Sequence, residues 1–138
     1  LYIVGCGQET TSLKKITKKY DLINNIKFCG KVSETKKNKL LSNAHINLIP
    51  GVQAYGLPAL ESLRMGVPTV INKESKICEI LKNNKMVKIT KNNQLNFSKS
   101  LLIYVEELKK SKIKKYKGDH LPTFKNWAHN LSKSCGWY

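Results

Sequence analysis

The sequence has little arginine and little negative charge. Lys and Arg together number 25, but Arg64 is the single arginine. Only 9 Asp and Glu residues oppose them, which leaves a formal net charge of +16. Proteins that read base sequence depend on the bidentate arginine fork, which lysine replaces poorly. We therefore expect no sequence-specific binding of nucleic acid. The lysine excess leaves open an electrostatic binder of polyanions or of an anionic membrane, with the run 109–117 as its site.

The chain also lacks the cysteine and histidine spacings of metal sites. Its four cysteines are far apart and form no CxxC pair, and its three histidines show no mutual spacing suited to ligands. We expect no metal and no bound cofactor. The cysteines, Cys6, Cys29, Cys78 and Cys135, are expected to be reduced and buried, as in a cytosolic protein.

Long apolar runs are absent as well. No run approaches the roughly 20 residues of a membrane-spanning helix, and the opening LYIVG is too short for a signal peptide. At 138 residues, 41% of them hydrophobic, the chain suits one soluble globular domain with a modest core. It opens on a strand-like run without an initiator methionine, which suggests a piece of a longer protein.

Short apolar runs alternate with longer amphipathic runs. This alternation predicts an α/β domain with a Rossmann-like parallel sheet and helices on both faces. We expect one partial domain over 1–112, a lysine-rich linker over 113–122 and a tail helix within 123–138. The expected strands are 1–4, 26–29, 45–50, 67–72 and 86–90, and the expected helices are 11–20, 33–44, 58–66, 75–84 and 95–112.

Ligands of parallel sheets bind in the loops that follow the carboxyl ends of the strands. The first such loop, GCGQET, has the context of a dinucleotide-binding fingerprint, but Thr10 stands where the third glycine is needed. We interpret this loop as a tight strand-to-helix turn.

The loop GVQAYGLPALE carries more information. Gly51 and Gly56 free the backbone to approach a ligand, and Pro58 suits a first helical turn. The unpaired amides of a helix start bind phosphate, whereas a carboxylate one turn later, Glu61, suits sugar hydroxyls. Together they indicate a nucleotide or nucleotide sugar. A glutamate that merely caps its own helix is the alternative, and the residues alone leave both open.

Several stretches resemble the carboxyl-terminal half of group-one, glycogen-synthase-like retaining glycosyltransferases with the GT-B fold. They are IVGCG, INNIKFCGKVS, LLSNAHINLIPGVQAYGLPALESLRMGVPTVIN and CEIL, and YGLPALESLRMGVPTV is the most specific part. The resemblance covers roughly residues 1–110. It implies a nucleotide-sugar donor domain, one half of a GT-B fold. The whole enzyme would move a sugar from a nucleoside diphosphate to a glycan, lipid or protein acceptor without a metal.

The resemblance also implies roles for single residues. Two family glutamates fall on Gln53 and Glu61, the candidate catalytic residues, and Gln53 lacks the charge of its family counterpart. Glu61 would bind the ribose hydroxyls, the 55–57 amides the diphosphate or sugar, and the loop after Gly30 the base. The implied donor-binding residues are Gly30, Val32, Ser33, Tyr55, Gly56, Leu57 and Glu61.

The sequence departs from the family in two ways. The family segment G-G-x-P-E-I is SKICEI here, and a first strand and helix with a basic pair for the diphosphate would precede Leu1. The amino-terminal acceptor domain, the expected partner, would precede it too. We expect a cytoplasmic donor domain that transfers no sugar alone and whose lysines can attach it to an anionic membrane. A catalytically inactive binding or scaffold domain is the alternative.

Overall fold

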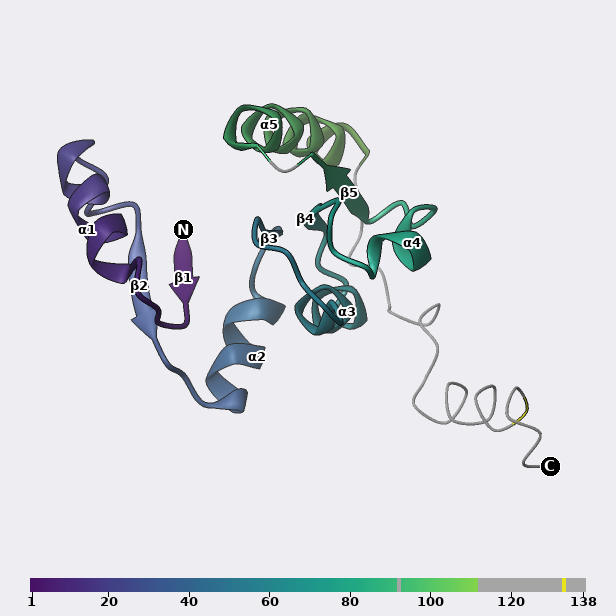
Figure 1. Ribbon diagram of the computed structural model, residues 1–138, viewed down its shortest axis with the longest axis horizontal. Helices are drawn as coiled ribbons and strands as arrows, with labels where there is room; N and C mark the ends of the chain where they lie inside the picture. The colour runs from purple at the N-terminus through teal and green to yellow at the C-terminus, as the bar shows by residue number, and fades with distance from the viewer. Residues whose placement is uncertain (92, 112–132, 134–138) are drawn as a thin grey trace. The chain divides into compact units, whose positions relative to one another are not determined.

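The structure is a computed structural model that describes residues 1–91, 93–111 and 133. The predicted linker 113–122 lies outside these residues, as does the predicted tail helix except for Lys133. The other ten predicted elements are all present within the described residues (Figure 1). The strands are β1 Tyr2–Val4, β2 Lys27–Gly30, β3 Asn47–Ile49, β4 Thr69–Asn72 and β5 Val87–Thr90. The helices are α1 Thr10–Lys19, α2 Glu34–Ser42, α3 Leu57–Arg64, α4 Cys78–Leu81 and α5 Gln94–Ser111.

The chain divides into two compact units, a first unit of Leu1–Leu40 and a second unit that begins at Leu41. Every strand pair is parallel, as predicted. The strands form a sheet of two, in the order β1-β2, and a sheet of three, in the order β3-β4-β5. The α/β architecture with parallel pairing is therefore confirmed, with the strands divided between two sheets.

The first unit joins its two strands through α1. Tyr2 lies opposite Lys27 and Ile3 opposite Phe28. The predicted turn after β1 is present: Gly5 has φ +109°, and the amide of Thr10 donates to the carbonyl of Gly7 at 3.1 Å, where α1 begins. Thr17 is the one buried residue of the first unit. Residues 1–40 therefore contain no buried hydrophobic side chain.

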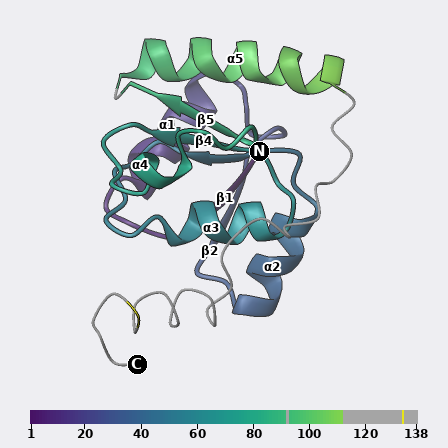
Figure 2. The ribbon, with the colours of Figure 1, turned by 90° about the vertical axis from the view of Figure 1, so that its right-hand side faces the viewer.

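The second unit has three layers. Figure 2 shows α5 along one face of β4 and β5 and α3 on the opposite face. All four residues of β4 are buried, as expected for a central strand of a parallel sheet covered on both sides. The core cluster lies here and consists of Ile49, Ala59, Leu63, Ile71, Ile77, Cys78, Leu81 and Met86.

The expectation that the cysteines are buried is corrected. Of the cysteines, only Cys78 is buried among those described; Cys29 is half-buried, and Cys6 is exposed because it occupies the open glycine turn. On α5, the apolar side chain of Leu102 is 68% exposed. The contacting face runs through Tyr104 at helical spacing, and Leu102 lies beside that face.

Candidate functional site

Two loops meet at the carboxyl edge of the second unit's sheet. Residues 50–56, here the β3–α3 loop, follow β3, and residues 73–77, here the β4–α4 loop, follow β4. The two strands are parallel neighbours, with Ile49 opposite Ile71. Their carboxyl ends therefore lie at one edge, where parallel sheets bind ligands.

Gly56 sets the start of α3. It has φ +66°, and a Cβ built on it would lie 2.3 Å from the Cγ2 atom of Ile77. Its carbonyl accepts hydrogen bonds from the amides of Ala59 at 3.0 Å and Leu60 at 3.2 Å, which begin the helix. Pro58 lies in the first turn, as predicted. A side chain at position 56 would thus be both strained and obstructed.

Three consecutive amides at this helix start remain available. Within the described residues, no hydrogen bond engages the backbone N–H groups of Tyr55, Gly56 or Leu57. The side chains of Tyr55 and Leu57 are 82% and 61% exposed, so solvent reaches this part of the loop. Unpaired amides at the positive end of a helix form a site for an anion such as phosphate.

Glu61 lies on the same helix, four residues after Leu57, and is half-buried. Side chains of a helix tilt toward its amino terminus and lie over the residue four positions earlier. Position 61 therefore lies on the side of α3 that faces the turn with these amides. A carboxylate is a poor neighbour for phosphate but a good acceptor for hydroxyl groups.

Gln53 lies in the middle of the β3–α3 loop and is half-buried. Its backbone amide donates to the hydroxyl of Ser75 at 3.0 Å. In the same loop the carbonyl of Pro50 accepts a hydrogen bond from the side-chain amide of Asn72 at 2.9 Å. The uncharged side chain of Gln53 can donate and accept hydrogen bonds at this edge.

Asn72 and Ser75 are site residues that the sequence analysis missed. Both are 1% exposed, which is unusual for polar side chains. The available signal was Asn72 at the end of an otherwise apolar strand, followed at once by a polar loop. A polar residue in that position must find a partner when buried.

A second polar cluster fixes α3 to β3. The hydroxyl of Ser62, which is fully buried, donates to the carbonyl of Pro58 at 2.7 Å. It also accepts a hydrogen bond from the side-chain amide of Asn47 on β3. Helix α3, which carries the amides and Glu61, is thereby tied to the strand before the loop.

The remaining predicted residues belong to the first unit. Gly30 ends β2 with φ +63°, Val32 is half-buried and Ser33 is exposed. Ser33 caps α2, because its hydroxyl accepts a hydrogen bond from the amide of Lys36 at 3.3 Å. The structure thus gathers Gln53, Tyr55, Gly56, Leu57 and Glu61 around one loop of the second unit and places the other three in the first.

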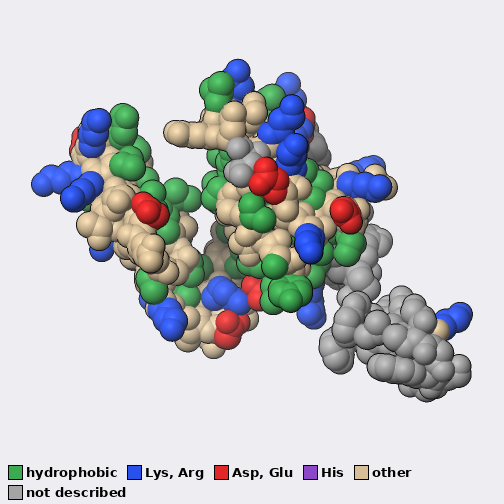
Figure 3. Space-filling view, in the orientation of Figure 1, with side chains coloured by type: hydrophobic (Ala, Val, Ile, Leu, Met, Phe, Trp, Pro, Cys, Tyr) green, Lys and Arg blue, Asp and Glu red, His purple; other side chains and the backbone are tan. Residues whose placement is uncertain are grey.

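Lysines are exposed in both units, and two lysines of the first unit lie near aromatic rings. The ammonium of Lys19 lies 5.7 Å from the centroid of the Tyr20 ring. The ammonium of Lys14 lies 5.8 Å from the centroid of the Phe28 ring. In the face shown in Figure 3, the Lys and Arg side chains of the second unit lie at separate positions and do not form one patch. Of the basic run 109–117, Lys109 pairs with Glu106 at 2.7 Å, and most of the rest lies outside the described residues.

The described ranges contain neither a cluster of metal-binding side chains nor a membrane-spanning helix. No group of three or more His, Cys, Asp or Glu side chains gathers there in a way that could hold a metal ion. None of the helices in that part of the chain is long and apolar enough to cross a membrane. Among the buried side-chain oxygens there, the hydroxyl of Thr90 has no hydrogen-bond partner.

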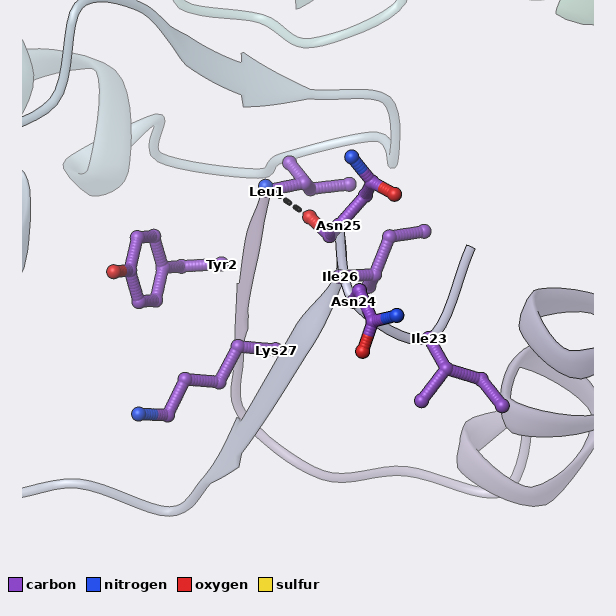
Figure 4. Close-up of a pocket in the computed structure, with 7 residues that line it drawn as sticks. All are labelled: Leu1, Tyr2, Ile23, Asn24, Asn25, Ile26 and Lys27. Carbon is purple, nitrogen blue, oxygen red and sulfur yellow. Dashed lines mark hydrogen bonds between the residues drawn. The ribbon is translucent and has the colours of Figure 1, made fainter. Parts of the chain in front are cut away.

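A pocket of about 400 Å³ lies at the amino ends of β1 and β2 in the first unit (Figure 4). There the amino group of Leu1 donates to the carbonyl of Asn25 at 2.7 Å. None of the predicted site residues lines this pocket, which lies at the amino ends of β1 and β2 instead of their carboxyl ends. Its lining consists of Leu1, Tyr2, Ile23, Asn24, Asn25, Ile26 and Lys27.

Comparison with solved structures supports the fold. The chain is similar to Anabaena Alr3699/HepE in complex with UDP, with a TM-score of 0.66 and 15% identity over 85% of this chain and 34% of that one. It is also similar to WaaG, a glycosyltransferase involved in lipopolysaccharide biosynthesis, with a TM-score of 0.67 and 15% identity over 86% of this chain and 31% of that one. The chain spans about a third of each structure. The likeness confirms the predicted fold, a Rossmann-like domain of the GT-B type.

The family assignment comes from the sequence comparison. No significant match was found among the curated proteins. The profile of the family described as "Glycosyl transferases group 1" matches residues 1–119 and so includes both candidate loops. The match spans most of the 138 residues. The chain therefore belongs to the group 1 glycosyl transferases.

Proposed function

We propose that this chain is the nucleotide-sugar-binding domain of a retaining glycosyltransferase that moves a sugar from a nucleoside diphosphate to a glycan, lipid or protein acceptor. The observation that carries the proposal is the start of α3. Three unengaged amides at residues 55–57 suit a diphosphate, and Glu61, one turn later on the same helix, suits ribose hydroxyls. A relative of the same fold was solved with UDP, and another acts in lipopolysaccharide synthesis.

In this proposal the domain works by positioning and by stabilising charge. The α3 amides and nearby lysines such as Lys76 neutralise the departing diphosphate, with no metal assigned to the step. Glu61 accepts hydrogen bonds from the ribose hydroxyls and so orients the nucleoside. Such preorganised donors are worth most where water is excluded, which also prevents water from acting as the acceptor.

The first unit has a smaller part in the proposal. The turn after Gly30, with Val32 and Ser33, would hold the base by backbone contacts. Acceptor binding is assigned to a separate domain, because the chain spans only about a third of its structural relatives. We accordingly expect the 138-residue chain to transfer no sugar by itself. Release of free nucleoside diphosphate by the purified chain in the presence of an acceptor would contradict this.

Gln53 supports a second candidate, an inactive binding or scaffold domain. Its side chain lacks the charge of the family glutamate, and its amide is tied to Ser75. The two candidates differ in the complete enzyme. If Gln53→Glu changes turnover there only modestly, the natural domain is competent and the scaffold alternative fails. If turnover appears only in the variant, the scaffold alternative holds.

The direct test of the donor site is a titration of the chain with UDP in which saturation-transfer NMR measures the binding. Affinity in the millimolar range suffices for this method. Glu61→Ala is expected to weaken binding by about tenfold or more, because hydrogen bonds to charged groups contribute about 1.5–3 kcal/mol. Glu106→Ala, on α5, is the matched control and should bind as the natural chain does. Equal binding by all three proteins would refute the assignment of Glu61.

A further inference from the structure

The β3–α3 loop is anchored at every third residue by the last residue of β4 and by two residues of the β4–α4 loop. The carbonyl of Pro50 accepts from Asn72 at 2.9 Å, and the amide of Gln53 donates to Ser75 at 3.0 Å. Gly56 is buried against Ile77, as the 2.3 Å approach of a built Cβ shows. The residues between these anchors, at 51, 52, 54 and 55, are exposed. The loop thus has three fixed points and an open surface.

The anchoring side chains are themselves rigid. Asn72 and Ser75 are 1% exposed, and Ile77 belongs to the core cluster. The side-chain oxygen of Asn72 accepts from the amide of Glu74 at 3.0 Å, and the amide of Ser75 donates to the carbonyl of Asn72 at 3.0 Å. Buried polar groups with all partners in place hold a single arrangement, because any other leaves a donor or acceptor unpaired.

We propose that Asn72, Ser75 and Ile77 are positioning residues that hold the β3–α3 loop in its ligand-binding conformation before the ligand arrives. None of them needs to touch the ligand. Ser75 fixes Gln53, and Ile77 fixes the turn at Gly56 from which the free amides follow. A loop that is already ordered saves the ligand the free energy of ordering it, so affinity rises without a new contact. The inference rests on the proposed function for its ligand.

The anchoring can be tested without any ligand, by amide hydrogen exchange of the natural chain. The amide of Gln53 is expected to exchange at least about fivefold more slowly than those of Tyr55 and Gly56, as a bond of about 1 kcal/mol requires. Equal exchange of the three amides would overturn the proposal. This measurement needs no variant and therefore does not depend on whether a substituted chain folds.

The effect on binding is tested with Ser75→Ala, which removes the hydroxyl that Gln53 uses. Exchange of the Gln53 amide should accelerate by about fivefold, and UDP affinity should fall by a similar factor. The matched control is Thr69→Val, which removes another buried hydroxyl, one that donates to the carbonyl of Val67 at 3.3 Å. Thr69 lies at the other end of β4, so Thr69→Val should lower the melting temperature and leave both readouts unchanged.

The outcomes separate the inference from the proposed function. If Ser75→Ala lowers only the melting temperature, as Thr69→Val does, Ser75 is merely structural and the inference is wrong. If the natural chain binds no nucleoside diphosphate, the proposed function fails, while exchange at Gln53 still decides whether the loop is anchored.

Discussion

At the residue scale, Gly56 is the position that tolerates least change. Its φ of +66° disfavours any side chain, and a Cβ would collide with Ile77, whose branched side chain lies in the core. We expect Gly56→Ala to lower the free energy of unfolding by about 3 kcal/mol, the sum of a left-handed backbone and an overpacked core.

Gly51→Ala is the matched control for this substitution. Gly51 belongs to the same loop, but a built Cβ there meets nothing within 4 Å. Its substitution should change the unfolding free energy by less than about 0.5 kcal/mol. Urea denaturation of both variants makes the comparison, and equal losses would show that the turn at Gly56 is not constrained as described.

Local pattern predicted some residues of the site and not others. Gly56, Pro58 and Glu61 could be predicted because turn, helix start and carboxylate lie within six residues. The bond between Gln53 and Ser75 joins residues 22 positions apart, and only the pairing of β3 with β4 brings them together. Sequence spacing carries no signal for a contact of that kind.

At the element scale, the position of α3 depends on Ser62. Its hydroxyl connects the helix to Asn47 on β3 and is fully buried. Ser62→Ala removes one acceptor and leaves the side-chain amide of Asn47 with a single weak contact, to the carbonyl of Pro58 at 3.4 Å. We expect a loss of about 1–3 kcal/mol in unfolding free energy.

The control for Ser62 is Ser98→Ala on α5. Ser98 also donates to a carbonyl of its own helix, that of Leu95 at 3.0 Å, but it is exposed. Its substitution should change stability by no more than about 0.5 kcal/mol. Thermal or urea unfolding that ranks the two serines equally would contradict the role given to the Asn47–Ser62 contact.

Helix α5 gives a pH-dependent prediction. Burial and, secondarily, the charge of Glu107 raise the pKa of Tyr104 from 10.0 to about 12. The folded state thus favours the neutral phenol, so stability is complete below about pH 10 and is lost as the pH rises toward 12. The loss should reach about 2–3 kcal/mol. Tyr104→Phe should remove this loss of stability. The unfolding free energies of both proteins are measured as a function of pH, and their difference removes the contribution of the lysines, which titrate in both. If the unfolding free energies of the two proteins fall in parallel between pH 10 and 12, the prediction is wrong.

The order of the elements was predictable, but their lengths were not. Apolar periodicity placed all ten, because each run is bounded by glycine, proline or polar residues. The predicted helix 75–84 is shortened to Cys78–Leu81. Its first residues form turns instead, with the amide of Cys78 donating to the carbonyl of Ser75 at 2.9 Å. The same residues anchor the neighbouring loop, a tertiary demand that periodicity does not contain.

At the scale of the whole molecule, composition predicts neither where the core lies nor which ligand binds. The buried hydrophobic residues lie in the second unit, and the first unit buries only Thr17. Composition alone could not predict that division, because it averages over the chain. The net charge of +16 suggests an anionic partner, but most of the lysines that are described lie exposed, separately, in both units. The loop with the free amides is the more specific feature.

The measurement that tests the central claim most directly is saturation-transfer NMR of the 138-residue chain with UDP, GDP, ADP and CMP, at low and at high salt. The donor-site account predicts that one nucleoside diphosphate is preferred, because the turn after Gly30 contacts the base. It also predicts that binding persists at high salt, because amides and a carboxylate hold the ligand by hydrogen bonds. A site made only of lysines would bind all four alike and lose them steeply as salt rises. That second result, or no binding at all, would contradict the account.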